Sequence, residues 1–215
     1  MTTSKSPKAV AQMAYLIAQK SLPVYKHQFS PHKFTQPQLA AILVLKEFFT
    51  TDYRGMIEIL KDSSDLRNIL ELSNIPHFTT IQKASREILK KKQIKKILRE
   101  MIVLAKELGI LDEKKNLSAI DSTGLEAGHT SRYFIKRREK GEKNLYQTTT
   151  YKRFPKLALI CNTFSHFILT ALGMKGPSPD VVHYKKLALE MDSLHHSDTL
   201  LADAGYDSEE SHRYA

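Results

Sequence analysis

Apolar residues in the first half of the chain recur at the three- to four-residue spacing of amphipathic helices. The spacing predicts helices within residues 36–60 and over residues 65–72. Another helix is expected to start at Thr79, which has capping-box spacing with Gln82, and to run with or without a break to about residue 108. Three prolines are expected to interrupt any long element in the first 30 residues. This half of the chain is therefore predicted to be helical.

After residue 112 the pattern changes to short β-rich runs. Residues 116–123, 156–163 and 166–174 read as strands, with the last two forming a hairpin. Residues 181–191 read as a helix, and residues 198–205 read as a final strand.

The order of these elements predicts an α+β or α/β fold in two domains. Residues 1–112 form the helical N-terminal domain, and residues 113–215 form a mixed sheet with helices.

Composition narrows the class of protein. The 215 residues are 41% hydrophobic and 26% charged, which is typical of a soluble globular protein. A single cysteine, Cys161, excludes an internal disulfide and a multi-cysteine zinc site. The longest apolar run, residues 39–45, is too short to cross a membrane, and the N-terminus lacks a signal-peptide core. We expect a cytoplasmic protein without a membrane partner.

Positive charge is concentrated in the middle of the chain. The formal net charge is +10, made up of +3 over residues 1–80, +11 over residues 81–156 and −4 over residues 157–215. Such a block is expected of a protein that binds a polyanion, because neutralised phosphates release counterions. A solvated basic helix face is the alternative interpretation.

The candidate DNA contacts lie in two places. Two belong to the helix that starts near Thr79, which reads either as the second helix of a helix-turn-helix or as part of a plain helical bundle. The others are interleaved with aromatic residues in a polar stretch that could equally be a solvated loop. Together they are Lys83, Arg86, Arg132, Lys136, Arg137, Arg138 and Lys143.

Two aspartates follow apolar strand-like runs. Asp121 ends "NLSAID" and Asp203 ends "DTLLAD". If the two strands are neighbours, the carboxylates meet at one sheet edge, where two negative charges favour a divalent cation between them. Oxygen-only ligands favour Mg²⁺ or Mn²⁺. Taken singly, either acid could simply cap a turn.

The segments around these acids resemble the catalytic region of DDE transposases of insertion sequences. The resemblance covers roughly residues 117–210 and is carried by "AIDSTGLE", "YKRFPKLALICNT", "LTALGMKGPSPD" and "LLADAGYDSEE". It implies a partial ribonuclease H-like fold, double-stranded DNA with terminal inverted repeats as partner, and metal-dependent strand cleavage and transfer. It also implies that Asp121 and Asp203 are the first and second catalytic acids and metal ligands. At Pro179-Asp180 the family often has His-Asp, so Asp180 is not assigned a catalytic role.

The resemblance also implies a third acid, a glutamate well past the second aspartate. Only 12 residues follow Asp203, so we expect an incomplete copy, and whether the chain is an active enzyme stays open. The alternative is a non-catalytic DNA-binding fragment that regulates or inhibits transposition. A third interpretation, an aspartyl-phosphate phosphohydrolase, leaves the basic block unexplained. The pattern does not fix the oligomeric state, and a homo-oligomer is one option.

Overall fold

The computed structural model describes most of the chain, namely residues 5–29, 31–112, 117–125, 154–176 and 178–213. The chain divides into two compact units, residues 1–107 and residues 108–215. The two units are described separately.

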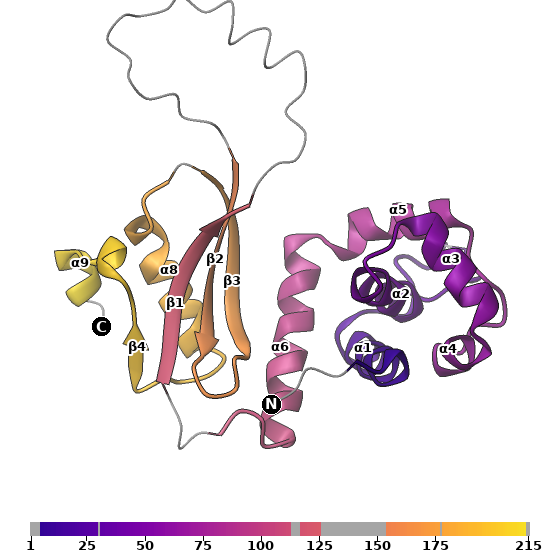
Figure 1. Ribbon diagram of the computed structural model, residues 1–215, viewed down its shortest axis with the longest axis horizontal. Helices are drawn as coiled ribbons and strands as arrows, with labels where there is room; N and C mark the ends of the chain where they lie inside the picture. Colours follow the sequence, from indigo (N-terminus) through magenta and orange to yellow (C-terminus); the bar gives the residue numbers. More distant parts are fainter. Residues whose placement is uncertain (1–4, 30, 113–116, 126–153, 177, 214–215) are drawn as a thin grey trace, which may run out of the picture. The chain divides into compact units, whose positions relative to one another are not determined.

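The N-terminal unit is built from helices (Figure 1). In chain order they are α1 (Pro7–Ser21), α2 (Gln36–Phe48), α3 (Tyr53–Asp62), α4 (Ser64–Ile69), α5 (Phe78–Ile88) and α6 (Lys91–Glu107). Helix α2 is central, because most of its residues are buried and it contacts α1, α3 and α5. Residues 36–60, whose apolar spacing predicted helix, form two helices, α2 and α3, that share one core.

Two details of the helix starts differ from the sequence predictions. Pro7 does not break an element but occupies the first turn of the 15-residue helix α1, where its missing N–H has no intrahelical partner to lose. The capping box predicted at Thr79 is wrong. His77 is the N-cap of α5, and its side chain accepts a hydrogen bond from the Thr79 N–H.

The C-terminal unit contains a four-stranded mixed sheet of order β3-β2-β1-β4. The strands are β1 (Leu117–Gly124), β2 (Phe154–Asn162), β3 (Ile168–Gly176) and β4 (Thr199–Leu201). Strands β2 and β3 form the predicted antiparallel hairpin, β1 pairs antiparallel with β2, and β1 pairs parallel with β4.

Helix α8 (Val181–Asp192) contacts β2 and β3 and forms a core with the sheet (Figure 1). Ile120, Ile160 and Leu169 of the sheet are buried together with Leu187 of the helix. A 3₁₀ turn, η1 (Ala204–Tyr206), and helix α9 (Glu209–His212) follow β4. The predicted fold class is confirmed, since helices are followed by a mixed sheet with helices that is consistent with a partial ribonuclease H-like fold.

Truncating Leu187 to alanine is expected to destabilise the C-terminal unit by about 2–5 kcal/mol, because its side chain is fully buried between α8 and the sheet. Leu189 of the same helix is 50% exposed, so Leu189→Ala is the matched control and should change stability by less than about 1 kcal/mol. Urea unfolding followed by circular dichroism measures both variants. Equal losses of stability would contradict the packing described for α8.

Candidate active site

The parallel pairing of β1 and β4 determines where the two predicted acids lie. The register pairs Leu117 with Thr199 and continues to Ala119 with Leu201. Asp121 and Asp203 each come two residues after the last of these pairs. The same offset therefore brings both aspartates to one edge of the sheet, where both are exposed.

Two features of the strands differ from prediction. Asp121 does not end its strand, because β1 continues to Gly124. Strand β4 is shorter than predicted and stops at Leu201, so that Asp203 lies past the strand. The physical reason is that Asp203 is the N-cap of η1, and its Oδ1 accepts a hydrogen bond from the Gly205 N–H at 3.0 Å.

Each of the two acids is oriented by one local hydrogen bond. Asp121 Oδ1 accepts from the Ser122 N–H at 2.6 Å, as Asp203 Oδ1 does from Gly205. Among the described residues, the second oxygen of each carboxylate has no hydrogen bond. The turn-capping interpretation is thus correct for Asp203, but it uses only one of that residue's two oxygens.

Asp180, which the sequence reasoning set aside, lies in a polar cluster next to these acids. It directly precedes α8, and its Oδ1 accepts a hydrogen bond from Ser122 Oγ at 2.5 Å and lies 2.5 Å from Lys156 Nζ. Burial opposes ionisation of this carboxyl, but the contacts with Lys156 and Ser122 outweigh it and lower its pKa. Asp180 therefore links α8 to β1 and β2.

The acid Asp180 is expected to make folding stability depend on pH. Because its pKa is lower in the folded than in the unfolded chain, its contribution is present above the ordinary carboxyl pKa of about 3.9 and is lost as pH falls through the lowered value. The stability advantage of the wild type over Asp180→Asn should therefore shrink as the pH is lowered below about 4. Urea unfolding at a series of pH values measures it, and an advantage that stays constant with pH would contradict the ionised pair.

The Tyr206 hydroxyl lies within electrostatic reach of the carboxylates. Its side chain is 2% exposed, and its oxygen makes no hydrogen bond among the described residues. Burial raises the pKa of this hydroxyl to about 12, although the neighbouring Ser122 side chain, which donates its own proton to Asp180, acts in the opposite direction. The charges of three carboxylates contribute to the increase, those of Asp180, Asp121 and Asp203. A buried, protonated phenol therefore lies within the electrostatic reach of all three acids.

The donor set fits Mg²⁺ or Mn²⁺ better than zinc, because the groups that converge are carboxylates. Within the part of the chain that the structure describes, no group of three or more His, Cys, Asp or Glu side chains is arranged to hold a metal ion. Asp121 and Asp203 could thus supply two protein ligands, with water completing the coordination.

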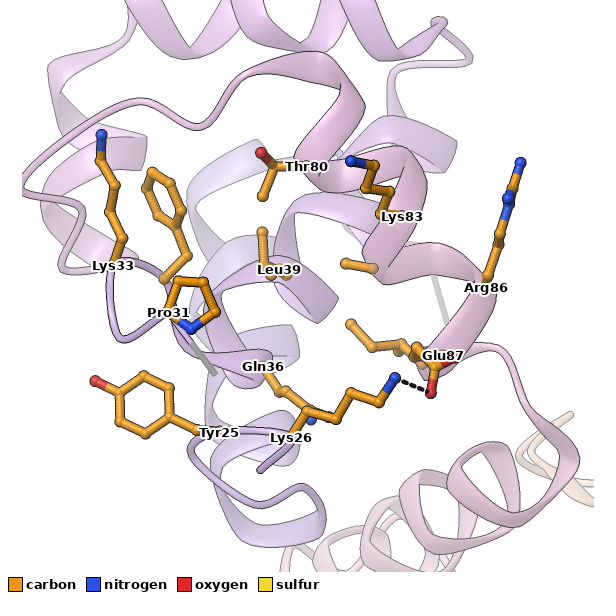
Figure 2. Close-up of a pocket in the computed structure, with 13 residues that line it drawn as sticks. Tyr25, Lys26, Pro31, Lys33, Gln36, Leu39, Thr80, Lys83, Arg86 and Glu87 are labelled. Carbon is orange, nitrogen blue, oxygen red and sulfur yellow. Dashed lines mark ion pairs between the residues drawn. The ribbon is translucent and has the colours of Figure 1, made fainter. Parts of the chain in front are cut away.

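Of the predicted DNA contacts, Lys83 and Arg86 lie on α5 and line a groove of about 560 Å³ in the N-terminal unit (Figure 2). The opposite side of the groove is formed by the segment before α2, which contributes Lys26 and Lys33. Glu87, the only acid among the described residues that line the groove, is paired with Lys26 at 3.0 Å, and the charge of this lining is therefore positive. The other five predicted contacts lie outside the described residues: Arg132, Lys136, Arg137, Arg138 and Lys143.

The groove was not predicted as such, because its two sides are far apart in the sequence. Tyr25 and His32, near the ends of the segment before α2, stack with ring centroids 4.1 Å apart and planes tilted by 15°.

The helix-turn-helix interpretation of α5 is not favoured by the loop before it. The connection from α4 to α5 covers residues 70–77, longer than the three to four residues of a helix-turn-helix. The DNA contacts at Lys83 and Arg86 stay a prediction, and both residues line the groove.

Residues 112–215 match the family model of the Transposase DDE domain. The C-terminal part of this chain is therefore a transposase DDE domain, as its sequence motifs predicted. No curated protein and no solved structure gives a significant match to the chain. No helix among the described residues is long and apolar enough to cross a membrane.

Proposed function

We propose that the chain is a DNA transposase of an insertion sequence, which binds terminal inverted repeats and catalyses metal-dependent strand cleavage and transfer. One observation supports this most strongly. Within a transposase DDE domain, Asp121 and Asp203 follow the same β1–β4 register to one exposed sheet edge, although 82 positions separate them in the sequence.

The roles proposed for individual residues follow from the geometry. Asp121 and Asp203 would hold Mg²⁺ or Mn²⁺, which when bound polarises a phosphate and activates a water or a 3′-hydroxyl for attack. The Ser122 and Gly205 N–H groups orient the two carboxylates through one oxygen each. Tyr206, buried below, supports the turn that carries Asp203.

The DNA would be held through its phosphates. Lys83 and Arg86 line the α5 side of a groove with positive charge on both sides, and the basic stretch around residues 132–143 would supply further contacts. Contacts of this kind position a duplex without reading its sequence. The specificity for terminal repeats must then come from other contacts.

The second candidate is a non-catalytic DNA-binding fragment that regulates or inhibits transposition. It is favoured by the finding that, among the described residues, no three metal-ligating side chains converge. It shares the basic groove with the first candidate and differs only in chemistry.

Two assays on the same protein separate the candidates. A gel shift with the element's terminal repeat tests binding, and nicking of that DNA with and without Mg²⁺ or Mn²⁺ tests chemistry. Metal-dependent nicking supports the transposase, and a specific shift without nicking supports the regulatory fragment. Failure of both would contradict the proposed function.

A further inference from the structure

The sheet edge with Asp121 and Asp203 has a third carboxylate nearby, that of Asp180. Asp180 lies beside the turn of Asp203, since a Cβ atom added to Gly205 would be 3.1 Å from Asp203 Oδ1 and 3.6 Å from Asp180 Oδ2. The two carboxylates therefore flank the same point above Gly205. Asp180 also accepts a hydrogen bond from Ser122, the residue that follows Asp121.

A positive charge is held in this cluster by the protein itself. Lys156 Nζ lies 2.5 Å from Asp180 Oδ1 and donates to the Ser178 carbonyl oxygen at 2.8 Å. The Lys156 side chain is only 12% exposed, so it is fixed in place and is not a mobile surface lysine. An ammonium ion in this position offsets the repulsion that Asp180 would otherwise add to the two metal-binding acids.

The buried phenol of Tyr206 is the independent sign that these groups share one site. Its hydroxyl is shielded from solvent and neighbours Ser122, the side chain that donates a hydrogen bond to Asp180. The same hydroxyl is influenced by Asp121, Asp180 and Asp203 together. A charge change at Asp180 is therefore expected to act in the same region as the other two acids.

We propose that Asp180 and Lys156 are positioning residues of the transposase site: a neutral ion pair that joins β1, β2 and α8 and sets the affinity of Asp121 and Asp203 for a divalent cation. This inference rests on the proposed function, because it assumes that these two acids bind the metal. Neither member of the pair touches the cation. Asp180 acts on Asp121 through Ser122 and on Asp203 across Gly205, and Lys156 limits how much negative charge the cation meets.

The proposal predicts effects of opposite sign for the two single variants. In Lys156→Met the Asp180 charge is no longer balanced, so Mn²⁺ should bind about three- to tenfold more tightly. In Asp180→Asn the largely buried ammonium of Lys156 loses its ionic partner beside the site, so Mn²⁺ should bind about three- to tenfold more weakly. The double variant restores neutrality and should bind Mn²⁺ about as well as the wild type.

Isothermal titration of the full chain with Mn²⁺ measures these affinities, and circular dichroism checks that each variant is folded. Lys61→Met is the matched control, because Lys61 pairs with Glu58 at 2.8 Å in the other unit and its loss should leave Mn²⁺ affinity unchanged. A pair that is only structural would weaken Mn²⁺ binding in both single variants, and that result would overturn the proposal. Absence of Mn²⁺ binding by the wild type would instead remove the metal site itself, and the proposal with it.

Discussion

Replacing Asp121 or Asp203 with asparagine should reduce Mn²⁺ affinity at least about 100-fold, because even partners of metal ligands contribute 10- to 100-fold. Each substitution removes one of two carboxylates that the β1–β4 register brings to the same edge. Any metal-dependent nicking by the chain should disappear together with metal binding. DNA affinity should stay the same or rise slightly, since a negative charge near the phosphates is removed.

Asp207→Asn is the matched control for this prediction. Asp207 lies in the same turn as Asp203, but its Oδ1 contacts His212 Nε2 at 2.7 Å and it belongs to the local structure before α9. It carries the same charge as the predicted ligands, so a general loss of negative charge would weaken Mn²⁺ binding equally in all three variants. Calorimetry that gave such equal losses would contradict a site formed specifically by Asp121 and Asp203.

A metal-binding pair of only two acids is also expected to be weak. Mg²⁺ prefers six oxygens in near-ideal octahedral geometry and would keep most of its waters here. Slow or absent cleavage by this chain is therefore compatible with intact Asp121 and Asp203. For this reason the metal titration is a sharper test of these two residues than the nicking rate is.

The sheet could be predicted from sequence because its signals are local. Two β-rich runs separated by a short turn predicted the hairpin of β2 and β3, and the helical pattern of residues 181–191 predicted α8. The parallel neighbour relation of β1 and β4 was only a condition in the sequence argument, since nothing local specifies which distant strands pair. The structure supplies this relation, and it places each acid two residues past the last β1–β4 pair.

The parts that sequence missed depend on contacts over long distances. The link from Asp180 to Lys156 joins a helix start to a strand 24 positions earlier, and an isolated Pro-Asp gave no sign of it. Tyr206 was assigned no role from the sequence, and only the fold shows that it is buried. The end of β4 was missed because the capping side chain of Asp203 competes with the strand for the backbone.

The same limit applies to the basic residues. Lys83 and Arg86 were recognised on a helix, but the groove needs the segment before α2 on its other side. The two lysines of that segment, Lys26 and Lys33, are 50 or more positions before Lys83, and no pattern in the sequence distinguishes them. Charge composition predicted a polyanion partner, while the shape of the groove depends on the packing of distant segments.

Reversing the charge of Lys136, Arg137 and Arg138 to glutamate should weaken DNA binding at least about 100-fold at roughly 0.15 M salt. Three lost phosphate contacts remove about three counterions from the release that drives binding, so the slope of log affinity against log salt should become shallower by about 3. All DNA sequences should be affected alike, because phosphate contacts carry no sequence information. Fluorescence anisotropy at several salt concentrations measures both quantities.

A charge reversal in the groove should weaken DNA binding less than the triple variant does. Lys83→Glu with Arg86→Glu removes two contacts and should cost about 30-fold, with a slope shallower by about 2. The control reverses the charges of Lys8 and Lys61, which are paired with Asp65 and Glu58 and lie outside the groove lining. The net charge falls by the same amount as in the groove variant. The DNA affinity of the control should nevertheless change far less. If the control loses as much affinity as the groove variant, overall charge and not this surface attracts the DNA. If neither the groove variant nor the triple variant changes the salt slope, the basic block is a solvated surface.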